Sequence, residues 1–166
     1  MKQTNLSIFV PHLGCPNTCS FCNQRFISGT QSAPTSDEVK LLLSQQQKVL
    51  EKNNTCAQIA FFGGSFTAID EAYRNELLKT AAEFIEKYPE QFLGIRCSTR
   101  PDFINKKILA SLKSYGVNAV ELGAQSMSDE VLAANDRGHT AKDVEVASEL
   151  IKEAGIELGL QMMTGL

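Results

Sequence analysis

The sequence lacks a long apolar run: no stretch approaches the roughly 20 residues that a membrane-spanning helix needs. It also lacks a basic N-terminal segment followed by a long apolar stretch, so we do not expect secretion. Positive charge is not in excess, because 16 Lys and Arg residues stand against 19 Asp and Glu residues. The net charge of −3 therefore offers no global electrostatic reason to expect nucleic-acid binding. No linker or low-complexity segment divides the 166 residues, a length typical of one domain.

Cysteine is present in an odd number, five, without the dense spacing of a disulfide-stapled scaffold. We therefore expect a reducing, cytoplasmic setting. Cys15, Cys19 and Cys22 fall within eight residues, and such clustering indicates a metal site before disulfides. Cys56 and Cys97 stand alone in apolar stretches, which predicts buried core thiols.

Short β-type runs alternate with longer helical patterns along the whole chain. The expected strands are 6–10, 56–62, 92–97, 117–124 and 156–163, and the expected helices are 35–52, 69–87, 104–115, 128–135 and 140–154. This alternation favours parallel strands joined by right-handed crossovers. It leaves two α/β architectures open, a doubly wound sheet or part of a β/α barrel. Both place function at the carboxyl ends of the strands.

Local signals mark several helix boundaries. Thr35 and Glu38 have the spacing of a capping box at the start of the first helix. Thr140 is expected to cap the last helix, and Gly116 fits the position just after the third. Asp102 is a candidate N-cap for the third helix, which we expect to begin at 104.

The cysteine triplet has two interpretations. His12 could join the three thiolates in a four-ligand zinc site, with the spacing H-x2-C-x3-C-x2-C. Alternatively, the thiolates could bind an iron–sulfur cluster. A 4Fe–4S cluster with three protein ligands would keep one iron free for a substrate or cofactor.

The spacing Cys-x3-Cys-x2-Cys in the loop after the first strand resembles the radical S-adenosylmethionine (radical SAM) superfamily, and Phe21 before Cys22 also matches. The resemblance implies that Cys15, Cys19 and Cys22 hold three irons of a 4Fe–4S cluster. It also implies that the fourth iron binds the amino and carboxylate groups of S-adenosylmethionine (SAM).

The second strand ends in Gly63-Gly64, and two glycines there allow a close backbone approach. They could form a plain tight turn. They also resemble the superfamily's Gly-Gly-Glu-like motif, which implies backbone contacts to the SAM amino group. Ser65 departs from the Glu of that motif.

The later strand ends resemble the elongator-subunit and coproporphyrinogen-dehydrogenase-like branch of the superfamily. The stretches that carry this likeness are Ser98-Thr99-Arg100-Pro101-Asp102, Glu121 to Gln125-Ser126, Arg137-Gly138-His139-Thr140 and the last strand around Met162. The resemblance implies that Gln125 lies near the SAM ribose, that Arg137 pairs with the SAM carboxylate and that Met162 lies near the adenine. Ser98 and Glu121 are further candidate SAM contacts. Glu121, inside an apolar strand, needs a partner on physical grounds.

The resemblance implies a parallel β/α partial barrel and predicts an enzyme. A 4Fe–4S cluster would cleave SAM reductively to a 5′-deoxyadenosyl radical that attacks a substrate that the sequence does not identify. The implied partners are a one-electron donor such as flavodoxin or ferredoxin, and a tRNA substrate is an alternative. A zinc-stabilised binding module without catalysis remains a second alternative. Because the family core has six strands, we expect residues 1–166 to be the N-terminal part of a longer protein, truncated after the fifth strand and with an exposed apolar edge.

Overall fold

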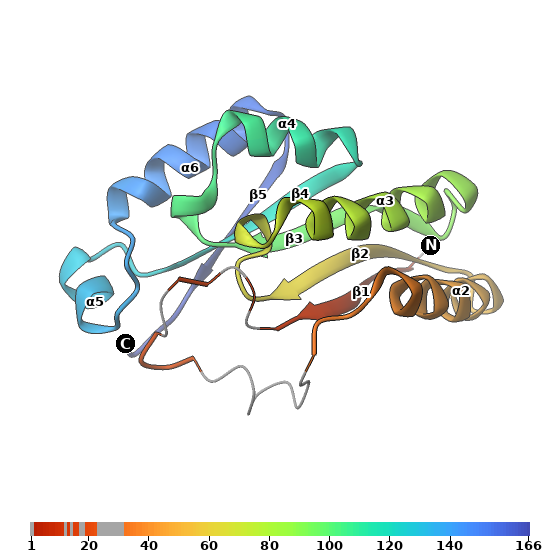
Figure 1. Ribbon diagram of the computed structural model, residues 1–166, viewed down its shortest axis with the longest axis horizontal. Coiled ribbons are helices and arrows are strands. Elements are labelled where there is room, and N and C mark those ends of the chain that lie inside the picture. The colour runs from red at the N-terminus through yellow and green to blue at the C-terminus, as the bar shows by residue number, and fades with distance from the viewer. Residues whose placement is uncertain (1, 12, 14, 17–18, 23–31) are drawn as a thin grey trace.

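The computed structural model describes residues 2–11, 13, 15–16, 19–22 and 32–166. In this part of the chain, five strands form one parallel sheet in the order β1-β2-β3-β4-β5 (Figure 1). The strands are β1 (Lys2–Val10), β2 (Thr55–Gly63), β3 (Phe92–Thr99), β4 (Val117–Gln125) and β5 (Glu157–Met162). The helices are α2 (Ser36–Lys52), α3 (Glu71–Lys87), α4 (Lys106–Ser114), α5 (Asp129–Ala134) and α6 (Ala141–Glu153), with 3-10 turns η1 (Phe66–Ala68) and η2 (Pro101–Phe103).

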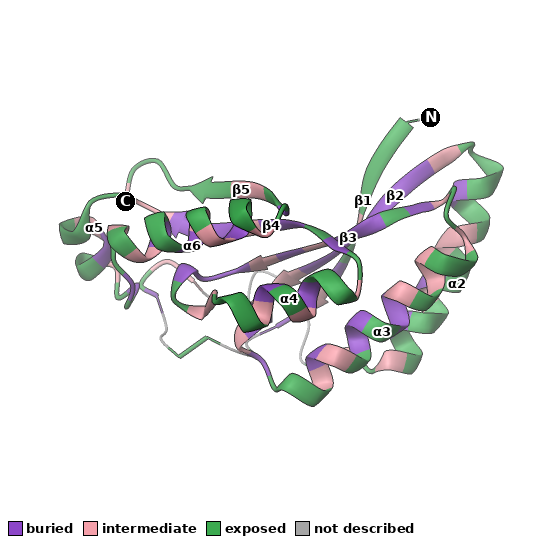
Figure 2. Ribbon diagram, turned by 90° about the horizontal axis from the view of Figure 1, so that it is seen from above, coloured by how far each residue is buried: buried purple, intermediate pink, exposed green. Residues whose placement is uncertain are grey.

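The strand order distinguishes between the two architectures that the sequence left open. A doubly wound sheet reverses its order at a switch point and carries helices on both faces. Here the order is sequential, and Figure 2 shows α2, α3 and α4 on one side of the sheet, with α6 over β4. The fold is therefore a partial β/α barrel, as expected.

The hydrophobic core lies between the sheet and these helices. The strand residues of this core include Ile59, Phe61, Ile95 and Leu122, which are fully buried. They pack with residues of the helices, including Leu43, Leu77, Leu78, Leu109, Leu112 and Ile151. The opposite face of the sheet carries polar side chains such as Gln58 and Arg96, which hydrogen-bond to each other.

Two capping boxes begin helices as the sequence indicates. Thr35 accepts the backbone N–H of Glu38, and the Glu38 carboxylate accepts the Thr35 N–H. Thr140 and Asp143 form the same reciprocal pair at α6. Gly116, with a φ of +84°, follows the end of α4.

The expected cap at Asp102 is wrong. α4 begins two residues later than expected, at Lys106, and the Asn105 side chain caps it by accepting the Ile108 N–H at 2.9 Å. Asp102 lies in η2, where its carboxylate binds the guanidinium of Arg100. A carboxylate bound in this way is not available to cap a helix.

Strand β1 is longer than expected at its amino end. Its first residues are polar and exposed, so no apolar pattern marked them, but they pair in register with β2 from Lys2 opposite Thr55 to Val10 opposite Gly63. At the other side of the sheet, Leu160 and Met162 of β5 are each half exposed. The expected exposed apolar edge is therefore present on β5.

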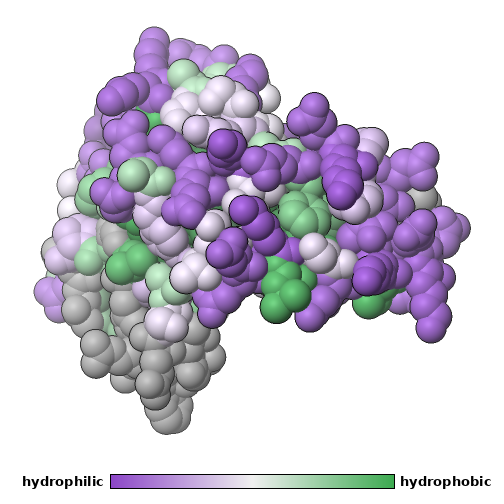
Figure 3. Space-filling view, turned by 45° about the vertical axis from the view of Figure 1, so that its right-hand side comes forward, coloured by the Kyte–Doolittle hydropathy of each residue, from purple (hydrophilic) through white to green (hydrophobic). Residues whose placement is uncertain are grey.

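Cys56 and Cys97 are buried core thiols, as expected. Burial, together with the smaller effect of the charge of Glu121, raises the pKa of Cys97 to about 12. This thiol is therefore neutral at physiological pH. In the face seen in Figure 3, apolar groups form small, separate patches among hydrophilic ones. The described helices include none that is long and apolar enough to span a membrane.

Candidate functional site at the carboxyl ends of the strands

The cysteine loop follows β1, and its described residues (13, 15–16 and 19–22) lie beside the carboxyl ends of the other strands (Figure 1). It rests on the end of α5: Ser20 donates its backbone N–H to the Asn135 carbonyl at 3.3 Å and its hydroxyl to the Asn135 side chain at 2.6 Å. Within the loop, the N–H of Cys22 donates to the carbonyl of Cys19 at 3.0 Å. The loop is thus held by residues more than 100 positions away.

Arg137 reaches this loop from the segment between α5 and α6. Its Nη1 donates to the Sγ of Cys19 at 3.1 Å, and its Nη2 donates to the carbonyl of Gly123 at 2.5 Å. The guanidinium also lies 5.8 Å from the ring centroid of Phe21, within cation–π range. Arg137 is only 6% exposed, and within the described part of the chain it has no carboxylate partner. A buried cation of this kind favours an anion beside it.

Cys15 lies beside the second strand end. Partial burial of its thiol raises its pKa, and three groups oppose that shift: a hydrogen bond from the Ser65 backbone N–H and the charges of Arg100 and Arg137. The charge of a Cys19 thiolate raises it again. The net effect is a raised pKa for the Cys15 thiol, although the charges of Arg100 and Arg137 oppose the shift.

Gly63 and Gly64 allow β2 to pass close to the end of β1 and to the start of the cysteine loop. A Cβ on Gly63 would lie 2.4 Å from the Val10 carbonyl oxygen, and a Cβ on Gly64 would lie 2.3 Å from the Leu13 carbonyl oxygen. Gly63 also has a φ of +126°, which favours glycine. The Gly64 N–H donates to Val10 at 3.1 Å. The glycines thus let the loop cross close to β2, and their backbone contact to SAM stays a prediction.

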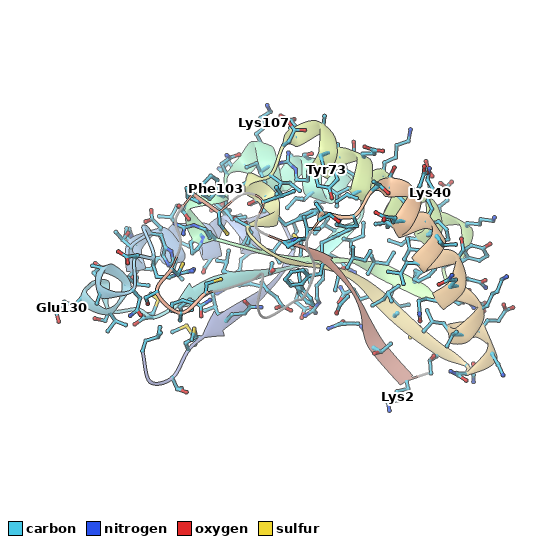
Figure 4. The ribbon with its side chains drawn as sticks, turned by 60° about the horizontal axis from the view of Figure 1, so that its bottom comes forward. Lys2, Lys40, Tyr73, Phe103, Lys107 and Glu130 are labelled. Atoms are coloured by element: carbon cyan, nitrogen blue, oxygen red, sulfur yellow. The ribbon has the colours of Figure 1, made fainter. Side chains whose placement is uncertain are left out.

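A buried hydroxyl network joins the ends of β2 and β3. The Thr99 hydroxyl lies 2.8 Å from that of Ser65 and 2.6 Å from that of Thr67. Thr67 also donates to the carbonyl of Phe103, which is labelled in Figure 4. We did not identify this network from the sequence, although hydroxyl residues at two strand ends are the signal that could have revealed it. It places Ser65 in a structural role where the superfamily motif has Glu.

Glu121 has the partner that its burial requires. It receives Arg96 Nη1 at 2.5 Å and Gln161 Nε2 at 2.6 Å, and Arg96 also donates to Gln58 at 2.8 Å. Ser98 pairs in register with Glu121, so both lie on the sheet face away from the helices. Our sequence reasoning missed Arg96, Gln58 and Gln161. Direct SAM contacts by Ser98 and Glu121 remain predictions.

Gln125 and Arg137 meet above Gly123. The Gln125 Nε2 would lie 3.2 Å from a Cβ on Gly123, and the Arg137 Nη2 would lie 3.4 Å from it. Gln125 has a φ of +65°, and its carbonyl accepts the N–H of Met163 at 2.9 Å. Met162 pairs in register with Gln125 on the outermost strand and is half exposed. The structure therefore brings Gln125 close to Arg137, which in turn contacts Cys19 and Phe21. Met162 lies at the edge of the site, on the outermost described strand.

His139 contacts the end of β4, next to Gln125. One ring nitrogen, Nε2, lies 3.2 Å from the carbonyl of Ala124, and the other, Nδ1, is buried without a partner among the described residues. Burial lowers the pKa of His139, and the charge of Arg137 lowers it further. The neutral imidazole is therefore the favoured form.

The donor set of the cysteine loop suits an iron–sulfur cluster, because thiolates are the ligands that select such clusters. Among the described residues, no three His, Cys, Asp or Glu side chains converge closely enough to hold one metal ion. His12, the fourth ligand of the zinc interpretation, lies outside the described residues. Two buried guanidinium groups beside Cys15 and Cys19 suit an anionic thiolate cluster.

Comparison with known proteins gives a consistent result. The sequence model of the radical SAM superfamily matches residues 9–166. Elongator complex protein 3 of Homo sapiens is 28% identical over 137 residues, which cover 74% of this chain and 25% of that protein. The tRNA uridine(34) acetyltransferase of Methanocaldococcus jannaschii is 26% identical over 144 residues, which cover 78% of this chain and 26% of that protein.

The fold comparison agrees with the sequence comparison. The solved structure of the archaeal Methanocaldococcus infernus Elp3, with an N-terminal deletion, superposes with a TM-score of 0.69 at 20% identity. The match covers all of this chain and 39% of that one. The chain spans about a quarter of the length of the curated relatives that it matches.

Proposed function

The chain belongs to the radical SAM superfamily, and we propose that it forms the catalytic core of a radical SAM enzyme in which Cys15, Cys19 and Cys22 bind a 4Fe–4S cluster. The observation that carries this proposal is the buried contact of Arg137 with Cys19 at the carboxyl ends of the strands. When bound, the cluster supplies the electron that cleaves SAM to a 5′-deoxyadenosyl radical. A one-electron donor such as flavodoxin or ferredoxin is the partner that this chemistry requires.

The residues of the chain would bind and orient the cofactors. Arg137 has a buried Nε without a hydrogen-bond partner among the described residues, so it can bind an anionic group such as the SAM carboxylate. Gln125 lies beside it over Gly123 and can donate an amide N–H to a ribose hydroxyl. Gly63 and Gly64 are half-buried and lie close to Val10 and Leu13 at the start of the cysteine loop, and we propose that their backbone contacts the SAM amino group.

Ser98, Glu121 and Met162 are the remaining candidate site residues. Ser98 and Glu121 lie on the helix-free face of the sheet, where a bound SAM would face them. Glu121 already binds Arg96 and Gln161, so we propose that it holds these two side chains in place beside the site. Met162, half exposed at the rim, is the candidate for contact with the adenine.

A tRNA substrate is the second candidate function. It is favoured by the likeness to a protein named tRNA uridine(34) acetyltransferase. The chain covers only 26% of that protein, and we propose that residues 1–166 are the N-terminal part of a longer enzyme whose other segments select the substrate. Anaerobic turnover with total tRNA, followed by mass spectrometry of the nucleosides, tests this: an altered uridine supports the idea, and unchanged nucleosides oppose it.

The decisive experiment uses anaerobic reconstitution of the full chain with iron and sulfide. We expect about four irons and four sulfides per chain, and 5′-deoxyadenosine after addition of SAM and dithionite. Cys19→Ala should lose both cluster and product. Cys56→Ala removes a buried thiol from the far end of β2 and should retain both.

Stoichiometric zinc without iron or sulfide would overturn the proposal in favour of the zinc-stabilised module. Equal loss of the cluster in Cys19→Ala and Cys56→Ala would show that the cysteine effect is not specific to the loop. A cluster that forms but yields no 5′-deoxyadenosine would reduce the proposal to binding without catalysis.

A further inference from the structure

A row of polar side chains crosses the helix-free face of the sheet from β2 to β5. Arg96 donates from Nε to Gln58 at 2.8 Å and from Nη1 to Glu121 at 2.5 Å. The other oxygen of Glu121 accepts Gln161 Nε2 at 2.6 Å, and Gln58 donates its own Nε2 to Asn118 at 2.5 Å. These five residues, which we call the polar row, therefore join four neighbouring strands through their side chains.

A β-bulge brings Asn118 into the polar row. The register of β3 against β4 shifts between Ile95 and Arg96, which leaves Asn118 as an extra residue of β4. Its side-chain amide donates to the Leu93 carbonyl at 3.1 Å. Gly94, with a φ of +142°, leaves room for that amide, because a Cβ there would collide with it. Bulges of this kind are frequent next to active sites, where they re-aim a side chain.

The two ionised residues fix which atoms donate and which accept along the polar row. A guanidinium can only donate, so Gln58 must offer Oε1 to Arg96 and Nε2 to Asn118. A carboxylate can only accept, so Gln161 must direct Nε2 to Glu121. Two groups beside Glu121 then have no hydrogen bond among the described residues: Arg96 Nη2, which can donate, and Gln161 Oε1, which can accept.

The charges around these two groups disfavour an ionic ligand. The charge of Arg96 is paired with Glu121, and Glu157, whose side chain is 74% exposed, lies 3.9 Å from Arg96 Nη2. An anion here would therefore meet two carboxylates, and a cation would meet the guanidinium. An amide group carries no charge, accepts through its oxygen and donates through its nitrogen. It matches the donor of Arg96 and the acceptor of Gln161.

The polar row lies close to the proposed SAM site. On β4, Glu121 comes two residues before Gly123, where Gln125 and Arg137 meet, and two residues of a strand span about 7 Å. Gly123 and Gly159, which pairs in register with Glu121, add no side chains to this face. A small molecule bound against the polar row would therefore have its other end beside the groups that we assign to SAM.

We propose that the polar row recognises the substrate, and that Arg96 and Gln161 bind an uncharged amide group of that substrate. This inference rests on the proposed function, because it places the substrate beside the SAM that the chain would cleave. The two residues then determine specificity. An amide satisfies both of them, whereas a carboxylate brings an acceptor against Gln161 Oε1 and a third negative charge next to Glu121 and Glu157.

The test is a titration of the full metal-free chain with three pyridines that differ in one substituent, followed by NMR of the backbone amides. At neutral pH nicotinamide is uncharged, nicotinate is an anion and 3-(aminomethyl)pyridine is a cation. We expect nicotinamide to shift the signals of residues 96–98, 119–123 and 159–161. We also expect it to bind severalfold more tightly than the other two.

Gln47→Leu is the matched control for Gln161→Leu. Gln47 donates its Nε2 to Glu51 at 3.0 Å on α2, so both changes remove a glutamine that is bound to a glutamate. Gln161 is exposed on the outermost described strand, so its replacement leaves the core unchanged. Gln161→Leu should weaken nicotinamide binding severalfold and abolish its advantage over nicotinate, and Gln47→Leu should do neither. Circular dichroism checks the fold of both variants.

Equal or tighter binding of nicotinate or of the amine would overturn the inference. So would the absence of nicotinamide shifts at the polar row, or an equal loss of binding in Gln161→Leu and Gln47→Leu. The proposed function fails separately. A chain that binds nicotinamide at the polar row but takes up no iron and sulfide on reconstitution would overturn that function and leave an amide-binding site.

Discussion

Replacing Gly64 with Ala should separate loading of the metal centre from stability of the fold. An added Cβ would lie 2.3 Å from the Leu13 carbonyl oxygen, which belongs to the cysteine loop. Ordinary contact begins at 3.4 Å, so the loop must move by about 3.4 − 2.3 = 1.1 Å. Leu13 is 39% exposed and lies outside the core, so the loop can shift outward while the sheet stays intact.

The displacement reaches Cys15, which is only two residues beyond Leu13 and hydrogen-bonded to the Ser65 N–H. We therefore expect Gly64→Ala to bind severalfold less iron after reconstitution. We expect the unfolding temperature of its metal-free form to stay close to that of the parent, because the core contacts between the sheet and α2 to α6 are unchanged.

Gly116→Ala is the complementary control. Gly116 has a φ of +84° after α4, but a Cβ there would meet nothing within 4 Å. The left-handed conformation costs a residue other than glycine roughly 1–2 kcal/mol. For a chain of this length, each kcal/mol lowers the unfolding temperature by roughly 2–4 °C. Gly116→Ala should thus melt earlier and load iron fully. Full iron loading in Gly64→Ala would refute the steric reasoning.

Two further predictions concern the supports of the site. Thr99→Val removes two buried hydrogen bonds, while Thr67 keeps its bond to the Phe103 carbonyl and Ser65 keeps the bond from the Arg100 N–H. At about 0.5–1.5 kcal/mol for each lost bond, the free energy of unfolding in urea should fall by about 1–3 kcal/mol. An effect no larger than that of Thr4→Val, on the exposed end of β1, would contradict this. Burial and the charge of Arg137 lower the pKa of His139 below its ordinary value of 6.5, so the unfolded chain takes up the proton first. The contribution of His139 to stability is therefore present above pH 6.5 and lost as the pH falls toward its lowered pKa. Urea unfolding at pH 7.5 and 5.5 should show this loss in the parent but not in His139→Gln, and an identical pH dependence in both would show that His139 is not its source.

The sequence predicted the elements of the fold well because their signals are local. Apolar spacing marked every strand, and the Thr35–Glu38 pair marked the start of α2. Where the local signal failed, a tertiary contact explains it. Asp102 is of a residue type that often caps helices, but it binds the buried Arg100. Asn105 caps α4 instead. The polar start of β1 was missed because strand pairing, not burial, orders it.

The cysteine spacing by itself indicated a metal centre, because the three thiols lie within eight residues and need no distant chain to meet. The resemblance to the superfamily, rather than the spacing, indicated an iron–sulfur cluster. What surrounds those ligands was decided only by the tertiary structure. Arg137 contacts Cys19 across 118 positions, and the Arg100 N–H after β3 donates to the Ser65 hydroxyl after β2. No local pattern specifies such pairs, because they depend on the order of the strands in the sheet. The three cysteines thus come from one short segment of sequence. The positive charge of Arg137 beside Cys19 comes from the packing of distant segments in the fold.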